Sequence, residues 1–429
     1  MPARFSSSHP DFHTSLAAFM AQRAAHAPDV AETVREILAR VKDEGDEAVI
    51  ALTGQFDHIS LSSNTMRFSK EDIERHAKAC DPSVVAALQF AAQRIRSYHQ
   101  AQMPQDYHTI DGAGVTLGWH WNALAAVGLY VPGGQASYPS SVLMNAIPAK
   151  VAGVARIAMV VPTPNGDVNP AILAAAQIAG VDEIYRIGGA QAVAALAYGT
   201  QSIMAVDKIV GPGNAYVAEA KRQVFGTVGI DMIAGPSEIL VVADNENNPD
   251  WIAADLLSQA EHDADAQSIL ITDDMAFGEM VAVSVEAILR ELPREAIARK
   301  SWQQHGAIIT VKHLAEAPAI INLLAPEHVE LAVTDPELLL PQIQHAGAIF
   351  LGRYSPEAIG DYLAGPSHVL PTSRTARFSS GLGVPDFMKR TSLIGVNKHA
   401  FQQIAPAAAV LADSEGLSAH ALSVRLRMK

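Results

Sequence analysis

The stretch from 125 to 161 decides the fold class, and it contains three segments: AAVGLYV at 125–131, SSVLMNAIPAKVAGV at 140–154 and RIAMVV at 156–161. The two flanking runs are short and continuously apolar, which is typical of parallel strands buried on both faces. The segment between them has the length and composition of a helix. A strand, a helix and a second strand in this order form a βαβ unit, so the stretch predicts a parallel sheet covered by helices.

The same alternation continues in both directions along the chain. In the first half, EIYRI at 183–187 and KIV at 208–210 are each followed by a helical run. A second series follows IDMIAGPSE at 230–238, and its apolar runs are EILVVAD, SILITDD, AIITV, VELAV and AIFLG. We therefore predict an α/β chain with two tandem, incomplete Rossmann-like parallel-sheet domains.

The two ends of the chain lack this alternation, and both are predicted to be helical. Near the N-terminus, Val34, Ile37, Leu38 and Val41 share one helical face. Asp29 is the candidate N-cap of this helix, and Gly45 is its candidate C-terminal stop. The last forty-odd residues are predicted to be a helical tail that ends in LSAHALSVRLRMK.

Composition excludes several classes of partner and site. The 429 residues carry a net charge of −14, which argues against nucleic acid or an anionic membrane as the main partner. Cys80 is the single cysteine, so neither an intrachain disulfide nor a thiolate zinc site is expected. MPARFSSSHPDFH lacks the apolar core of a signal peptide, and no apolar run has the length of a membrane span. A cytoplasmic location is expected.

Three glycine-rich loops follow predicted strands of the first series. They are YVPGGQ at 130–135, RIGGAQ at 186–191 and VGPGN at 210–214. Glycine allows the backbone to approach a phosphate, and the following helix N-terminus offers free amides. None of the three is a GxGxxG motif, and a glycine at a strand end is more often only a tight turn, so any one of them alone is weak evidence. Together they make a nucleotide or phosphate ligand a candidate.

Two ionisable clusters lie in the second series. Gln259 and His262 in SQAEHDAD are three residues apart and share a helix face, which fits either a metal site or a solvated polar face. The residues alone favour His262 with a carboxylate as ligands, because a neutral amide is a poor zinc donor. Glu327 and His328 in LLAPEHVEL stand before a predicted strand, as an acid–base pair or as an ordinary loop pair.

Two further clusters lie nearer the C-terminus. Asp361 and His368 flank the Gly-Pro turn of GDYLAGPSHVLPT and are candidate ligands in a loop. Glu415 and His420 in DSEGLSAH are five residues apart, so on a straight helix they would diverge by about 140°. By itself this last pair is typical of a surface.

Taken together and in this order, the motifs resemble the histidinol dehydrogenase family from about residue 30 to the end. The segments that carry the resemblance are YVPGGQASYPSSVLM, GGAQAVAALAYGT, KIVGPGNAYVAEAKRQV, IDMIAGPSE, DLLSQAEH, APEHVEL, GDYLAGPSHVLPT and EGLSAH. The resemblance implies an NAD-dependent oxidation of histidinol through histidinaldehyde to histidine. It also implies one Zn²⁺ per subunit and a homodimer whose C-terminal tail crosses to complete the partner's site.

The resemblance implies a role for each motif residue. The implied zinc ligands, which also lie at the substrate, are Gln259, His262, Asp361 and His420. The implied acid–base pair is Glu327 and His328, and the other implied substrate contacts are Ser237, His368 and Glu415. The implied NAD contacts, one on each glycine-rich loop, are Tyr130, Gln191 and Asn214. Ser367 and Gln135 depart from the pattern of some relatives, which bears on fine specificity only.

The implied division of the chain follows from these roles. Residues 1–25 are an N-terminal helical segment, 26–129 with 238–382 form the zinc and substrate domain, 130–237 bind NAD, and 383–429 form the crossing tail. The rival hypotheses are a related zinc dehydrogenase of another chelating alcohol such as sulfopropanediol, a zinc hydrolase, and a zinc-stabilised binding protein. Glu415 argues against a sulfonate because both are anionic, and the glycine-rich loops are unexplained in a hydrolase.

Overall fold

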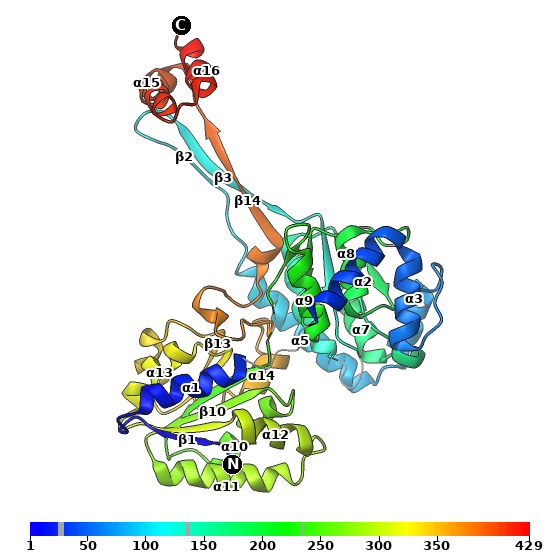
Figure 1. The fold of residues 1–429 in the computed structure, drawn as a ribbon, viewed down its shortest axis with the longest axis vertical. Helices are drawn as coiled ribbons and strands as arrows, with labels where there is room; N and C mark the ends of the chain where they lie inside the picture. The colour runs from blue at the N-terminus through cyan, green and yellow to red at the C-terminus, as the bar shows by residue number, and fades with distance from the viewer. Residues whose placement is uncertain (25–29, 134–137, 234) are drawn as a thin grey trace.

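Two parallel sheets, each with its own helices, form the body of the molecule, and a narrow arm projects from it (Figure 1). The computed structural model describes residues 1–24, 30–133, 138–233 and 235–429. Within these residues, no helix is both long enough and apolar enough to cross a membrane. The predicted α/β class with parallel sheets is confirmed.

The five-stranded sheet has the order β6-β5-β4-β7-β8, and all its strands are parallel. Its strands are β4 Ala126–Tyr130, β5 Arg156–Val160, β6 Glu183–Tyr185, β7 Lys208–Val210 and β8 Gly229–Ile230. The connecting helices are α6 Pro139–Ala152, α7 Pro170–Ala179, α8 Gly189–Tyr198 and α9 Ala215–Val224. The strand order reverses direction between β4 and β7, which is where parallel sheets of this kind bind their ligands.

The six-stranded sheet has the order β1-β11-β10-β9-β12-β13 and is also parallel throughout. Its strands are β1 Ala3–Ser6, β9 Glu238–Ala243, β10 Gln267–Thr272, β11 Ala307–Thr310, β12 His328–Ala332 and β13 Ala348–Leu351. Its helices are α1 Phe12–Ala24, α10 Pro249–Ala260, α11 Met275–Leu289, α12 Glu295–His305, α13 Ala317–Leu324 and α14 Glu357–Tyr362. The prediction of a helical segment over residues 1–25 is wrong at β1, because Ala3–Ser6 becomes a strand by pairing with β11, and a pairing so distant in sequence has no local signature.

Four N-terminal helices cover the five-stranded sheet and its own helices. They are α2 Ala31–Glu44, α3 Asp46–Asp57, α4 Lys70–Ala79 and α5 Pro82–Gln100. The predicted face of α2 is buried as expected, and the helix ends at Gly45 with φ 63°. Asp29 lies outside the described residues. This packing differs from the predicted grouping of 26–129 with the substrate domain, because an amphipathic pattern does not reveal which sheet a helix covers.

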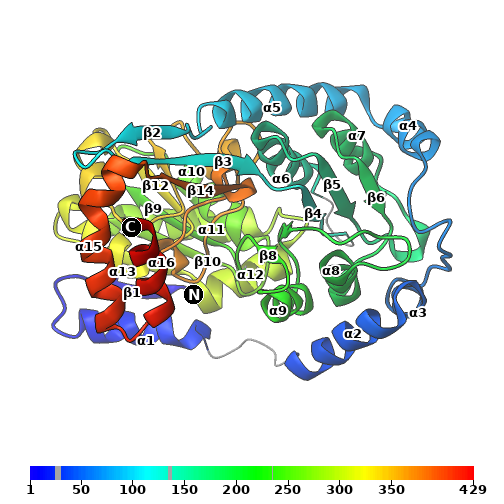
Figure 2. The same cartoon turned by 90° about the horizontal axis from the view of Figure 1, so that it is seen from above.

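The arm is a three-stranded antiparallel sheet capped by two helices (Figures 1 and 2). It consists of β2 Tyr107–Ile110, β3 Thr116–Ala123, β14 Met388–Gly395, α15 Lys398–Ser414 and α16 Ser418–Met428. The prediction of a helical tail over 383–429 is wrong at β14, whereas α15 and α16 are helices as expected. That strand pairs along its whole length with β3, and a pairing between segments so far apart in sequence has no local signature.

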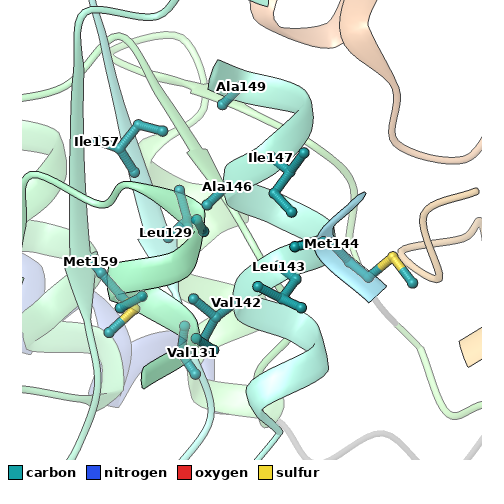
Figure 3. Close-up of a cluster of buried hydrophobic side chains, with 14 of the residues drawn as sticks. Leu129, Val131, Val142, Leu143, Met144, Ala146, Ile147, Ala149, Ile157 and Met159 are labelled. Carbon is teal, nitrogen blue, oxygen red and sulfur yellow. The ribbon is translucent and has the colours of Figure 1, made fainter. Parts of the chain in front are cut away.

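The largest hydrophobic cluster lies under α6. Figure 3 shows its side chains interleaved with those of β4 and β5. Leu143 is completely buried there, beside Val131, Val142 and Met144. Nearly every residue of α6 is buried because the helix packs against α5, α7 and the sheet.

Leu143→Ala is expected to lower the free energy of unfolding by about 2–5 kcal/mol, because it removes a buried side chain and leaves a cavity. Denaturant titration followed by circular dichroism measures this loss. Leu338→Ala is the matched control: its side chain is 71% exposed, and the expected change is within about 0.5 kcal/mol. Equal losses for the two variants would contradict the packing of α6.

Candidate active site

A cavity of about 290 Å³ lies where the two sheets meet. Its lining from the five-stranded sheet comes from the carboxyl ends of the strands, at the start of α6 and in the loop before α9. Its lining from the six-stranded sheet comes from the opposite, amino edge. At this edge, strands β9 and β12 begin and helices α10 and α14 end. This arrangement brings motifs far apart in sequence onto one cavity.

Most of the predicted site residues line this cavity. They are Asn214, Ser237, Gln259, His262, Glu327, His328, Asp361 and His368. Glu415 and His420 are not among them. Glu415 directly follows α15 and His420 lies in α16, and both are exposed at the far end of the arm (Figure 1). The structure therefore does not bring these two residues into the cavity of their own chain.

Glu327 and His328 are buried side by side at the start of β12. The Nδ1 atom of His328 lies 3.0 Å from the backbone oxygen of Glu238 and 2.9 Å from Nε2 of Gln259. The Glu327 carboxylate accepts a hydrogen bond of 2.9 Å from the backbone N–H of Glu238. Burial lowers the pKa of His328, which favours a neutral imidazole. Burial likewise raises the pKa of Glu327 well above its usual value.

The residues around this pair fit a metal ion. Gln259 is only 1% exposed, and within the described part of the chain its Oε1 atom has no hydrogen-bond partner. Within the same residues, the Nε2 atom of His328 is also buried without a hydrogen-bond partner. Buried polar atoms in folded proteins are almost always paired, so these two indicate a missing ligand. Imidazole, carboxylate and amide donors around one cavity suit a divalent cation.

Glu357 belongs to this group and was missed from the sequence. Its Oε1 atom lies 3.7 Å from Nε2 of His328. His328, Glu357 and Asp361 each offer a ligand atom within 4.8 Å of the others. The available signal was the spacing in PEAIGDY, since carboxylates four residues apart share a helix face. This face of α14 points both acids at the cavity.

The two acids of α14 are close enough to disfavour a second negative charge. The pKa of Asp361 is raised to about 9, first by burial and then by the charge and hydrogen bond of Glu357. A bound cation would offset both effects, because an opposite charge stabilises the ionised carboxylate.

His368 contacts residues on both sides of the cavity, those of the five-stranded sheet and those of the six-stranded sheet. Its Nε2 atom lies 3.1 Å from Oγ of Ser141, at the start of α6, and its Nδ1 atom lies 3.0 Å from the backbone oxygen of Asp361. Burial lowers its pKa to about 4, so the imidazole is neutral. Ser367 instead turns away to the backbone oxygen of Met144, at 3.4 Å, and Gln135 lies outside the described residues.

The three predicted cofactor contacts stand at the carboxyl edge of the five-stranded sheet. Tyr130 ends β4, and its hydroxyl accepts a hydrogen bond of 2.9 Å from the backbone N–H of Gly189. Gln191 lies in the first turn of α8 and is 1% exposed. Asn214 caps α9 by accepting from the N–H of Val217 at 3.2 Å. Asn214 also lines the cavity, which links this edge to Glu327 and His328.

A family model for histidinol dehydrogenase matches residues 20–428. The chain belongs to this family. The histidinol dehydrogenase of Ruegeria pomeroyi is 61% identical over 428 residues, which covers 100% of this chain and 99% of that protein. The histidinol dehydrogenase of Rhodospirillum rubrum is 61% identical over 429 residues, with the same coverage.

The crystal structure of histidinol dehydrogenase from Elizabethkingia anophelis has the same fold. Its TM-score is 0.93 at 36% identity, and the match covers 100% of this chain and 98% of that one. The predictions of a histidinol dehydrogenase, of an oxidoreductase and of a role in histidine biosynthesis are confirmed. The alternatives, a dehydrogenase of sulfopropanediol or a zinc hydrolase, find no support in these relatives.

Proposed function

We propose that this cavity oxidises L-histidinol to L-histidinaldehyde and then to L-histidine, with NAD accepting a hydride in each step. The observation that carries the proposal is the buried Glu327–His328 pair at the cavity wall, beside an incomplete set of metal ligands. The family of dehydrogenases to which the chain belongs supports it. A cytoplasmic location remains part of the same proposal.

His328 is the base of the first oxidation. Its neutral imidazole can take the hydroxyl proton of histidinol while the carbinol carbon loses a hydride to NAD. When its Nδ1–H donates to the backbone oxygen of Glu238, Nε2 is the atom left for the proton. NAD reaches the cavity from the carboxyl edge of the five-stranded sheet, where Tyr130, Gln191 and Asn214 contact it.

Glu327 is the base of the second oxidation. It removes a proton from water as the oxygen attacks the aldehyde carbon, and the hydrate that forms loses the second hydride to NAD. Burial raises its pKa above the usual value, which makes the ionised carboxylate a stronger base. The N–H of Glu238 keeps the carboxylate in one orientation through both steps.

The metal of the site is Zn²⁺, one for each subunit. Its ligands from one chain are Gln259, His262 and Asp361, and the fourth is His420 of the partner subunit. When bound, zinc supplies a Lewis acid that holds the imidazole and amine of the substrate in position. Ser237, His368 and the partner subunit's Glu415 complete the contacts to the substrate.

The arm supports a homodimer with shared sites. Its side chains include large apolar groups that are more than half exposed, and these are Ile110, Ile394, Val410, Leu411, Leu422 and Leu426. An extended arm with so many exposed apolar groups requires another surface to cover them. A second copy of the chain supplies this surface, and the crossing carries Glu415 and His420 to the partner's cavity.

Glu327→Gln is expected to slow oxidation of histidinaldehyde by about 10²–10⁴-fold, because it removes the base that activates water. Oxidation of histidinol to the aldehyde should fall far less, since His328 serves that step. Each step is assayed separately by NADH absorbance, with histidinol or with histidinaldehyde supplied as substrate.

Glu337→Gln makes the same chemical change at an exposed position and serves as the control. Equal losses in both steps for Glu327→Gln would mean that the division of labour between the two residues is wrong.

A further inference from the structure

Buried oxygens without partners gather at the carboxyl edge of the five-stranded sheet, away from the metal ligands. Within the described residues, Oε1 of Gln191, Oγ1 of Thr163 and Oδ2 of Asp57 are buried and accept no hydrogen bond. Gln191 and Thr163 are 1% and 2% exposed. Because such atoms are costly to leave unpaired, they indicate a ligand that donates hydrogen bonds at this edge.

Asp57 reaches this edge from outside the sheet. It is the last residue of α3, which packs against α8 and against the short turn Pro164–Gly166 that follows β5. Its negative charge is one of the causes that raise the pKa of Tyr130, after burial. The Asp57 carboxylate therefore lies near the hydroxyl of Tyr130, which the N–H of Gly189 also contacts.

The strand order explains why a carboxylate is needed here. In dinucleotide-binding sheets of the order 3-2-1-4-5, an acid that follows the second strand accepts hydrogen bonds from the adenosine ribose. The second strand here is β5, and the residues that follow it, Val161, Pro162 and Thr163, include no acid. Asp57 from α3 stands next to that vacant position.

We propose that Asp57, together with Thr163, binds the adenosine ribose hydroxyls and makes the site selective for NAD over NADP. The inference rests on the proposed use of a nicotinamide dinucleotide. A ribose diol donates two hydrogen bonds, which pair the carboxylate and the hydroxyl oxygen. The 2′-phosphate of NADP has no such donor when fully ionised, and its charge is repelled by Asp57.

Arg186 is the feature on this edge that would favour the opposite preference. It directly follows β6, and its guanidinium lies 4.1 Å from the ring centroid of Phe68. Stacking on the ring engages the face of the guanidinium, although its edge still has donors for a phosphate. A binding experiment therefore measures the combined effect of Asp57 and Arg186 on the preference for NAD over NADP.

The test is equilibrium binding of NADH and NADPH, followed by the fluorescence of the reduced nicotinamide, to the full-length protein. Wild type should bind NADH more tightly than NADPH by at least about tenfold, and Asp57→Asn should reduce that ratio by about tenfold or more. Glu47→Gln removes one negative charge from an exposed position of the same helix and should leave the ratio unchanged. 2′-Deoxy-NADH, tested on wild type, should bind more weakly than NADH and needs no variant to fold.

The outcomes separate this inference from the proposed function. If wild type binds NADH but Asp57→Asn keeps the ratio of the Glu47→Gln control, Asp57 is not the discriminating residue and the use of NAD still stands. If 2′-deoxy-NADH binds as tightly as NADH, the inference is overturned even when Asp57→Asn does not fold. If wild type binds neither NADH nor NADPH, the proposed cofactor itself is wrong.

Discussion

An equal mixture of His262→Asn and His420→Asn subunits is expected to recover roughly a quarter of wild-type activity, although each variant alone is inactive. The reason is that the two residues of one site are proposed to come from different subunits. In a mixed dimer, one site receives both substitutions and the other receives neither. Random exchange of equal amounts makes about half of the dimers mixed, each with one intact site of two.

Subunit exchange has to be allowed, by co-expression or by joint refolding, and tagged heterodimers can then be purified and assayed. His399→Asn, at an exposed position of α15, is the matched control and should retain full activity without a partner variant. Folded heterodimers that remain inactive would show that His420 acts within its own subunit or not at all.

Removal of the metal by a chelator is expected to lower turnover by more than about 100-fold, because the metal holds the substrate where the charge changes of the reaction occur. Added Zn²⁺ should restore the activity. Without the cation, the buried acids of α14 lose the opposite charge that stabilises their ionised forms, and a ligand that binds only the folded state is gone, so the metal-free protein should also unfold at a lower temperature.

Metal analysis supplies the matching measurement. Zinc should bind with one ion per subunit, and Asp361→Asn should weaken it, whereas Glu337→Gln at an exposed position should not. Full activity in protein verified to be free of metal would refute the assigned ligands.

The sheets were predictable because the parallel strands in this chain are short and consist mostly of buried apolar residues. The runs at β4, β5, β9 and β10 leave no polar face to water, and a proline lies two residues after β4 and after β5. The arm was not predictable in the same way. Almost every residue of strand β14 is exposed. The strand forms because it pairs with β3, and no local pattern in 388–395 reveals this pairing.

The site shows the same limit. The motifs indicated Glu327, His328 and Asp361 as candidate site residues. They share one cavity because the amino edge of one sheet faces the carboxyl edge of the other. The sequence principle that ligands bind at carboxyl ends of strands holds for only one of the two sheets. Only the family resemblance implied Gln259 as a metal ligand. In the structure, its Oε1 atom is buried without a partner among the described residues, which is a physical reason to expect a ligand there.

The most direct measurement of the central claim is the number of NADH molecules formed for each molecule of histidinol consumed. Limiting histidinol is added to the zinc-loaded protein with excess NAD, and the final absorbance of NADH is compared with the amount of histidine formed. Two NADH and one histidine per histidinol are expected, because Glu327 and His328 are proposed to serve two successive oxidations in one cavity. One NADH with accumulation of the aldehyde, or no NADH at all, would contradict the account.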